Sequence, residues 1–120
     1  MTVIKLKRVY ETADSDDGAR ILVDRLWPRG LARDKAHIDL WLKEIAPSDA
    51  LRKRFHGKPE DWGAFKSAYA AELKSPDAKP AVEEILKRIR QGPVTLLYAA
   101  RDEQHNNAVV LKQWLDRKAR

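Results

Sequence analysis

Cysteine is absent from the 120 residues of this chain. Without a thiol the protein has no disulfide, no thiolate nucleophile and no sulfur-ligated zinc, and this absence is typical of proteins from reducing compartments. Histidine is scarce as well, because His37, His56 and His105 are the only three and none forms an i, i+4 pair. We therefore expect no metal site, although carboxylates around one histidine would still suit a magnesium-like ion.

Long apolar runs are also missing. The longest covers residues 96–100, far fewer than the roughly 20 residues that span a bilayer. Residues 1–10 alternate polar and apolar side chains and lack the apolar block of a signal peptide, so we expect a cytoplasmic protein that does not enter membranes. Glycine-rich nucleotide loops and the Gly-x-Ser-x-Gly motif are absent too. Dinucleotide-binding, P-loop and serine-hydrolase functions therefore have no motif to support them, and no cofactor is indicated.

Basic residues outnumber acidic ones. Lysine and arginine number 24 against 18 aspartate and glutamate residues, which leaves a net charge of +6. Such an excess suits a nucleic acid or another anionic partner. However, the basic residues are spread along the chain, and only residues 51–58, LRKRFHGK, form a cluster. We interpret most of the excess as a well-solvated surface.

Hydrophobic spacing indicates one α/β domain that covers residues 1–120, without a linker or a repeat. The pattern predicts strands at 3–10, 20–26 and 94–100, whereas 38–42 fits a short strand or a helix. It predicts helices at 48–55, from 59–61 through 73, after 75–77 as far as Gly92, and at 106–118. We expect a small, mostly parallel sheet flanked by helices, with the apolar strand 94–100 at its centre because both its faces must be covered.

A polar block, RDEQHNN at 101–107, separates a predicted strand from a predicted helix. In open α/β sheets, ligands bind beyond the carboxyl ends of strands, where helix N-termini present free N–H groups. Asp102 or Asn106 is suited to cap the helix, but a cap accounts for only one or two of the seven polar residues. Arg101 adds a planar cation for a carboxylate or phosphate. The block therefore predicts a site for an anionic or polar ligand.

His105 adds an imidazole to this block, the side chain whose charge changes near neutral pH. A helix N-terminus disfavours a protonated histidine and favours bound anions. We therefore expect His105 to be neutral at pH 7, exposed, and beside Arg101 in an anion pocket. The competing expectation is a histidine packed inside the fold, with no pocket near it.

A second cluster, DRLWPRG at 24–30, surrounds a corner fixed by proline and glycine. Arg25 and Arg29 carry the planar cations preferred for bidentate binding of anions. Trp27 is either an aromatic platform or a core side chain. Asp24 is either part of a site or the partner of an arginine in an internal ion pair.

Four segments resemble the YeaO-like family, domain-of-unknown-function family 488 (DUF488), a group of small bacterial proteins. They are VDRLWPRG at 23–30, DLWLKEIAPS at 39–48, LRKRFHG at 51–57 and VTLLYAARDEQHNNAVVL at 94–111. The resemblance spans nearly the whole chain. It implies a compact single α/β domain in the bacterial cytoplasm, and it implies no established activity.

The resemblance also implies candidate site residues, the positions that match the motifs of the closer group. They are Arg25, Trp27, Arg29, His56, Arg101, Asp102, His105 and Asn107. Among them, our own hypothesis assigns acid–base chemistry to His105 and Asp102, and ligand binding to the others. Wider relatives carry a Cys-His-Arg-like triplet where this chain has Asn106, Asn107 and Ala108, and Tyr98 stands where an earlier cysteine can occur. Thiol or metal chemistry of such relatives is therefore not carried over to this chain.

The function we favour is the binding of a small phosphorylated or carboxylated molecule by an enzyme or a sensor. Arg25, Arg29 and Arg101 would hold the anion, His105 would act as acid or base, and Asp102 would orient it. The sequence leaves open whether a reaction follows, what the substrate is, and whether the chain forms oligomers.

Two other functions remain open. A nucleic-acid-binding module would use Arg52, Lys53 and Arg54 on phosphates and Trp27 to stack on a base. A protein-interaction domain would carry no chemistry at all.

Overall fold

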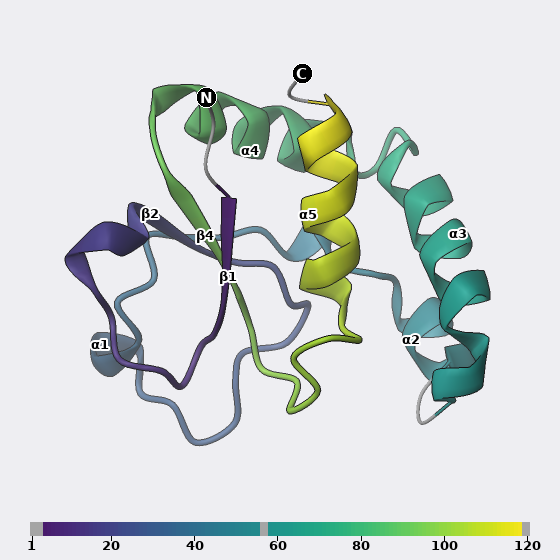
Figure 1. Cartoon of the computed structure of the whole chain (residues 1–120), viewed down its shortest axis with the longest axis horizontal. Coiled ribbons are helices and arrows are strands. Elements are labelled where there is room, and N and C mark those ends of the chain that lie inside the picture. The colour runs from purple at the N-terminus through teal and green to yellow at the C-terminus, as the bar shows by residue number, and fades with distance from the viewer. Residues whose placement is uncertain (1–3, 56–57, 119–120) are drawn as a thin grey trace.

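Four parallel strands form the sheet in the computed structural model, which describes residues 4–55 and 58–118 (Figure 1). They are β1 (Ile4–Arg8), β2 (Ala19–Leu22), β3 (Leu40–Trp41) and β4 (Val94–Tyr98). Their spatial order is β1-β4-β2-β3, and each neighbouring pair is parallel. The wholly buried strand β4 therefore lies inside the sheet, between β1 and β2, which confirms the prediction from its apolar composition.

The described part of the chain also contains α-helices, which together with the parallel sheet confirm the α/β class. They are α1 (Arg33–Ala36), α2 (Asp49–Phe55), α3 (Trp62–Leu73), α4 (Lys79–Gln91) and α5 (Asn107–Lys118). Short 3-10 turns cover Ser15–Asp17, Lys43–Ile45 and Pro59–Asp61. In Figure 1, α5 lies beside β1, α4 crosses the upper end of the sheet, and α2 and α3 pack together on the other side of α5. Within the described residues, no helix has the length and the apolar character needed to cross a membrane.

Several helix boundaries follow from local chemistry that the sequence displays. The hydroxyl of Ser48 accepts a hydrogen bond from the backbone N–H of Leu51 at 3.1 Å, which caps α2 as predicted. Pro80 lies in the first turn of α4, where its missing N–H leaves no bond unmade. Asn106 precedes α5 and accepts from the N–H of Val109 at 3.0 Å. Caps and prolines therefore place these three helix starts within a residue or two.

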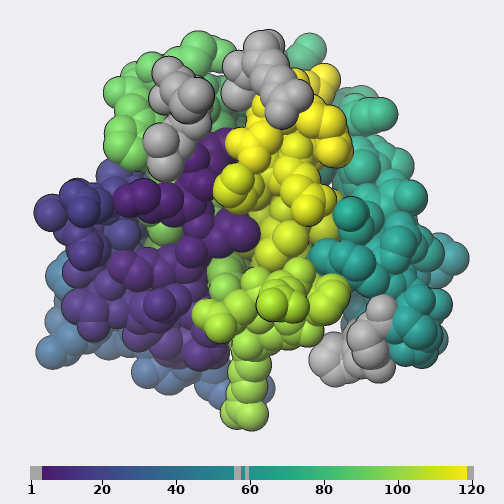
Figure 2. Space-filling model, in the orientation of Figure 1, coloured from purple at the N-terminus to yellow at the C-terminus, as the bar shows by residue number. Residues whose placement is uncertain are grey.

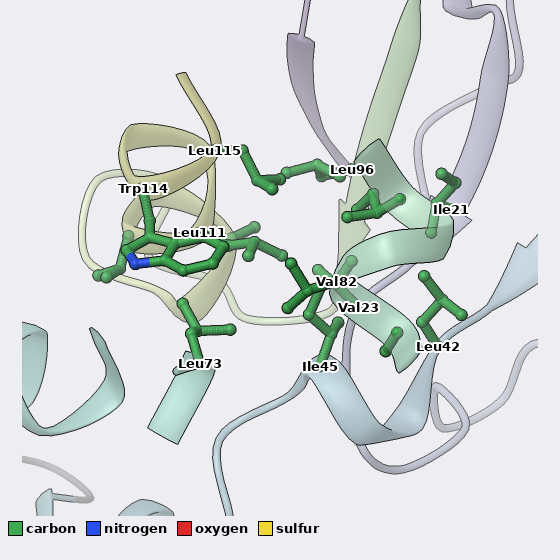
Figure 3. Close-up of a cluster of buried hydrophobic side chains, with 14 of the residues drawn as sticks. Ile21, Val23, Leu42, Ile45, Leu73, Val82, Leu96, Leu111, Trp114 and Leu115 are labelled. Atoms are coloured by element: carbon green, nitrogen blue, oxygen red, sulfur yellow. The ribbon is translucent and has the colours of Figure 1, made fainter. Parts of the chain in front are cut away.

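The sheet separates a large core from a small one because side chains alternate along each strand. Ile21 and Leu96 belong to the larger core with side chains of α4 and α5, and Figure 3 shows Leu96 beside Leu115. Leu22 and Leu97, their neighbours in sequence, are fully buried on the opposite face against the chain between β2 and β3. The radius of gyration is 13.6 Å, close to the value of about 14 Å expected of one compact domain of this length.

Strand β2 ends at Leu22, four residues before the predicted boundary at residue 26. The N–H of Val23 still donates to the carbonyl of Leu97 at 3.1 Å. The next bond of a parallel ladder would join the N–H of Ala99 to the carbonyl of Val23. Instead, the Asp24 carboxylate accepts from Ala99 at 2.9 Å, and the Asn107 side chain donates to Val23 at 2.9 Å. Two side chains replace the ladder, and β2 and β4 stop pairing at that point.

The chain between β2 and α2 differs from the prediction in two smaller ways. Helix α1 was not predicted, because it has four residues and too few to show a helical period. Residues 38–42, which fitted a strand or a helix, form the two-residue strand β3 and then enter the 3-10 turn Lys43–Ile45. The strand alternative is therefore correct, over a shorter span.

Candidate ligand-binding cleft

A cleft of about 790 Å³ opens beyond the carboxyl ends of β1, β2 and β4, the edge at which open α/β sheets bind ligands. Its volume lies within the range of roughly 300–1,000 Å³ that holds small molecules. In Figure 1 these strand ends and the loop between β4 and α5 face the lower edge of the picture. Figure 2 shows the same yellow-green loop at the surface, between the N-terminal segment and the helical segment coloured teal.

Asp24 and Asn107 form the floor of the cleft. Asp24 follows β2, and its two carboxylate oxygens accept from Ala99 N–H at 2.9 Å and from the Asn107 side-chain amide at 3.1 Å. The same Asn107 amide donates to the carbonyl of Val23 at 2.9 Å. Because Asn107 is the first residue of α5, these bonds join the end of β2 to the end of β4 and to the start of that helix.

The charge of Asp24 is poorly compensated. Burial raises the pKa of Asp24, while its bonds to Ala99 and Asn107 and the charge of Arg52 oppose that rise. Among the described residues, no lysine or arginine forms an ion pair with Asp24 within 4.0 Å. The internal ion pair considered from the sequence is therefore not formed. Asp24 was not included among the predicted site residues, although it precedes one of them, Arg25, and accepts a hydrogen bond from another, Asn107.

His105 and Asp102 lie side by side at one edge of the cleft. Asp102 accepts from the backbone N–H of Gln104 at 2.9 Å and of His105 at 3.0 Å, and its second oxygen lies 3.2 Å from Nδ1 of His105. These two backbone bonds hold the pKa of Asp102 below its usual value. The side chain of His105 is 44% exposed, not packed in the core. Asp102 thus orients the imidazole toward the cleft.

An aromatic wall, Phe55, Trp62 and Phe65, lines another side of the cleft. The rings of Trp62 and Phe65 are stacked, with centroids 5.6 Å apart, and Phe55 meets Phe65 edge-on at 5.9 Å. Trp62 also meets the ring of His105 edge-on at 5.1 Å, so the wall ends at the imidazole. In the sequence, Trp62 and Phe65 have the spacing of an apolar stripe on a helix, and this spacing does not distinguish a core from a cleft wall.

Five basic side chains line the cleft, against two aspartates, and we call the part that they line its mouth. They are Arg25, Arg29, Arg52, Lys53 and Lys58. Arg25 already donates to the carbonyls of Ala46 and Pro47 at 3.1 and 3.2 Å, which leaves it fewer donors for a ligand. The side chains of the other four are exposed.

Trp27 lines the cleft but is also packed. Its ring meets that of Trp41 edge-on at 5.4 Å, its Nε1 donates to Leu31 at 2.6 Å, and the guanidinium of Arg33 lies 4.4 Å from its centroid. Trp27 is therefore half-buried by its packing and also borders the cleft.

The structure brings together all but one of the predicted site residues that it describes. Arg25, Trp27, Arg29, Asp102, His105 and Asn107 all line the cleft. Arg101 is exposed and does not line it, so the expected pairing of Arg101 with His105 in one pocket is not formed. His56 lies outside the described residues. Across residues 4–55 and 58–118, no three histidine or acidic side chains are grouped so as to hold a metal ion.

Comparison with known proteins identifies relatives over the full length of the chain. The family described as "Inactive DUF488-N3 subclade" (DUF488-N3i) matches residues 3–120. The uncharacterized protein YeaO of Escherichia coli is 45% identical over 112 residues, which cover 93% of this chain and 96% of that protein. The uncharacterized protein Rv3073c of Mycobacterium tuberculosis is 39% identical over 96% of this chain and 95% of its own length. No solved structure shows a significant match.

Proposed function

This chain belongs to the DUF488-N3i family of YeaO-like proteins. We propose that it binds a small anionic ligand in the cleft and that it does not catalyse a reaction on this ligand. The observation that carries this proposal is the excess of basic over acidic side chains, five against two, that line a cleft beyond the strand ends. Phosphate and carboxylate groups pair with such cations, and partial enclosure strengthens the pairing. The ligand would be a cytoplasmic metabolite.

Two further observations favour binding over turnover. The matching subclade is described as inactive. This chain also has Asn106, Asn107 and Ala108 at the positions where wider relatives carry a Cys-His-Arg-like triplet. Asn106 caps α5 and Asn107 holds Asp24, so both side chains have structural partners. His105, oriented by Asp102, would then serve as a hydrogen-bonding group for the ligand.

A titration with pyrophosphate, followed by ¹H–¹⁵N NMR at low ionic strength, tests the proposal. We expect the signals of His105 and Asn107 to shift with saturation. Replacing one mouth cation, in Arg29→Ala or Lys53→Ala, should weaken binding about tenfold, the effect of one lost hydrogen bond between charged groups. Lys87→Ala is the matched control, because Lys87 is exposed on α4 and does not line the cleft. Equal weakening in all three variants, or no saturable shift, would contradict the proposal.

A generic single-stranded oligonucleotide serves as the second probe in the same titration. A nucleic-acid-binding surface would bind it with an affinity that falls steeply with salt and depends on Arg52, Lys53 and Arg54. Arg54 lies 5.0 Å from the ring centroid of Phe55, and Trp27 is already packed by Trp41 and Arg33. We therefore expect weak oligonucleotide binding that these charges do not control.

A further inference from the structure

The floor of the cleft recognises a different chemistry from its mouth. A carboxylate accepts up to about four hydrogen bonds, and Asp24 receives one on each oxygen, from Ala99 and from Asn107. One lone pair on each oxygen is left, on a carboxylate that lines the cleft without an ion-pair partner among the described residues. An anionic group would be repelled there. The part of a ligand that reaches the floor must therefore donate hydrogen bonds.

The aromatic wall adds a second requirement. Phe55, Phe65 and Trp62 contact one another in series and offer a continuous aromatic surface in the same cleft as Asp24 and the basic side chains. Flat heteroaromatic rings stack or pack edge-on against such side chains, whatever their substituents. A ligand with a planar middle would cover this wall and leave its anionic end among Arg29, Lys53 and Lys58.

From these features, and resting on the proposed anion-binding function, we propose that the ligand is a nucleoside mono- or diphosphate with an amino-bearing base. The base lies along the aromatic wall, its donors meet Asp24, and its phosphates lie among the basic side chains of the mouth. Guanine suits this floor best, because its N1–H and its amino group point side by side at two carboxylate oxygens. Uracil presents carbonyl oxygens on both sides of its single N–H, which an acceptor-only floor repels.

Isothermal calorimetry of the full chain with guanosine diphosphate, uridine diphosphate and pyrophosphate tests this assignment. All three probes carry a diphosphate group, but the two nucleotides differ in their base and pyrophosphate has no base. We expect guanosine diphosphate to bind at least about tenfold more tightly than either of the others, the discrimination typical of a bidentate contact with a base. Inosine diphosphate, which lacks the amino group, should fall between guanosine and uridine diphosphate.

Two variants separate the floor from the wall. Asp24→Asn should bring the affinities for guanosine and uridine diphosphate together without weakening pyrophosphate, because it removes an acceptor and a repulsive charge. Trp62→Leu should weaken both nucleotides by a similar factor and leave pyrophosphate unchanged. Lys87→Ala should alter none of these affinities. Since Asp24 also holds Ala99 and Asn107, its variant is first checked for a native NMR spectrum. If it does not fold, the ratio of inosine to guanosine diphosphate affinity in the intact chain decides.

The outcomes distinguish this inference from the function on which it rests. Pyrophosphate binding that needs Arg29, together with no preference for guanosine diphosphate over pyrophosphate or uridine diphosphate, overturns the nucleotide assignment and keeps the anion site. Absence of binding by pyrophosphate and by every nucleotide overturns both.

Discussion

Removing the Asn107 side chain should destabilise the protein by an amount that depends on pH. Its amide donates to the neutral carbonyl of Val23 at 2.9 Å and to the Asp24 carboxylate at 3.1 Å. A bond to a neutral partner contributes about 1 kcal/mol, and a bond to an ionised one about 1.5–3 kcal/mol. Asn107→Ala should therefore lower the free energy of unfolding by about 3 kcal/mol near neutral pH, and by about 1–2 kcal/mol where Asp24 is protonated.

The direction of the pH dependence follows from Asp24. Burial raises its pKa in the folded state above the value of 3.8 expected of an exposed aspartate. Such a group stabilises the fold fully below its unfolded pKa, and this stabilisation is lost as the pH rises through the folded pKa. Loss of the Asn107 donor raises the folded pKa of Asp24 further, so the variant loses more stability over that rise. The difference between wild type and variant should therefore grow as the pH rises from about 4 toward neutral pH.

Urea unfolding of both proteins across that range measures this difference, and the other carboxylates cancel in the comparison. Asn106→Ala is the matched control, because its side chain bonds the backbone of Asp102 and of Val109 and no carboxylate. It should cost about 2 kcal/mol, through loss of the helix cap and of the bond to the Asp102 carbonyl, equally at every pH in the range. A pH-independent difference for Asn107→Ala, or one that is larger in acid, would refute the role assigned to Asp24.

Two further substitutions test the framework around the cleft. Tyr69→Phe should lower the free energy of unfolding by about 1–2 kcal/mol with an unchanged urea slope, because the buried phenol donates to the carbonyl of Ile45 at 2.6 Å; a cost near zero would contradict this. Burial raises the pKa of Tyr69 far above its ordinary value, so that cost should not vary with pH below about 9. Arg20→Met should cost about 3 kcal/mol, because it removes one of the two cationic partners of buried Asp17, which keeps Lys7 at 3.2 Å, and leaves the carbonyls of Ala36 and His37 without the Arg20 donor. The same change at exposed Arg90 should stay within about 0.5 kcal/mol, and similar losses in the two variants would contradict the reasoning.

The helices and the position of β4 could be predicted because their signals are local. Ser48, Pro80 and Asn106 mark helix starts through bonds that reach only a few residues along the chain. The apolar composition of residues 94–98 indicates an interior strand without any knowledge of its partners. Such features depend on neighbouring residues, which the sequence displays directly.

The end of β2 and the floor of the cleft could not be predicted in the same way. Asp24 is separated by 75 residues from Ala99 and by 83 from Asn107, and no local pattern announces either bond. The aromatic wall escaped prediction for another reason, since Trp62 and Phe65 have the spacing of core residues on a helix. They line the cleft because the fold places the start of α3 beside the β4–α5 loop, where Trp62 meets His105. This placement is a property of the assembled fold.

Several polar side chains of the block that follows β4 form hydrogen bonds within the protein, so fewer are free to bind a ligand than the composition of the block indicates. Asp102 accepts from two backbone N–H groups of its own loop, Asn106 caps α5, and Asn107 holds Asp24 and Val23. Capping and loop closure therefore account for more of the block than the sequence led us to expect. His105 is the one member whose side chain meets the aromatic wall, and its ring is oriented by Asp102. Three polar side chains of the block therefore bind the loop backbone, the start of α5 or the end of β2, and together they hold His105 at a fixed place in the cleft. A fixed imidazole favours recognition of a particular ligand over nonspecific attraction of anions.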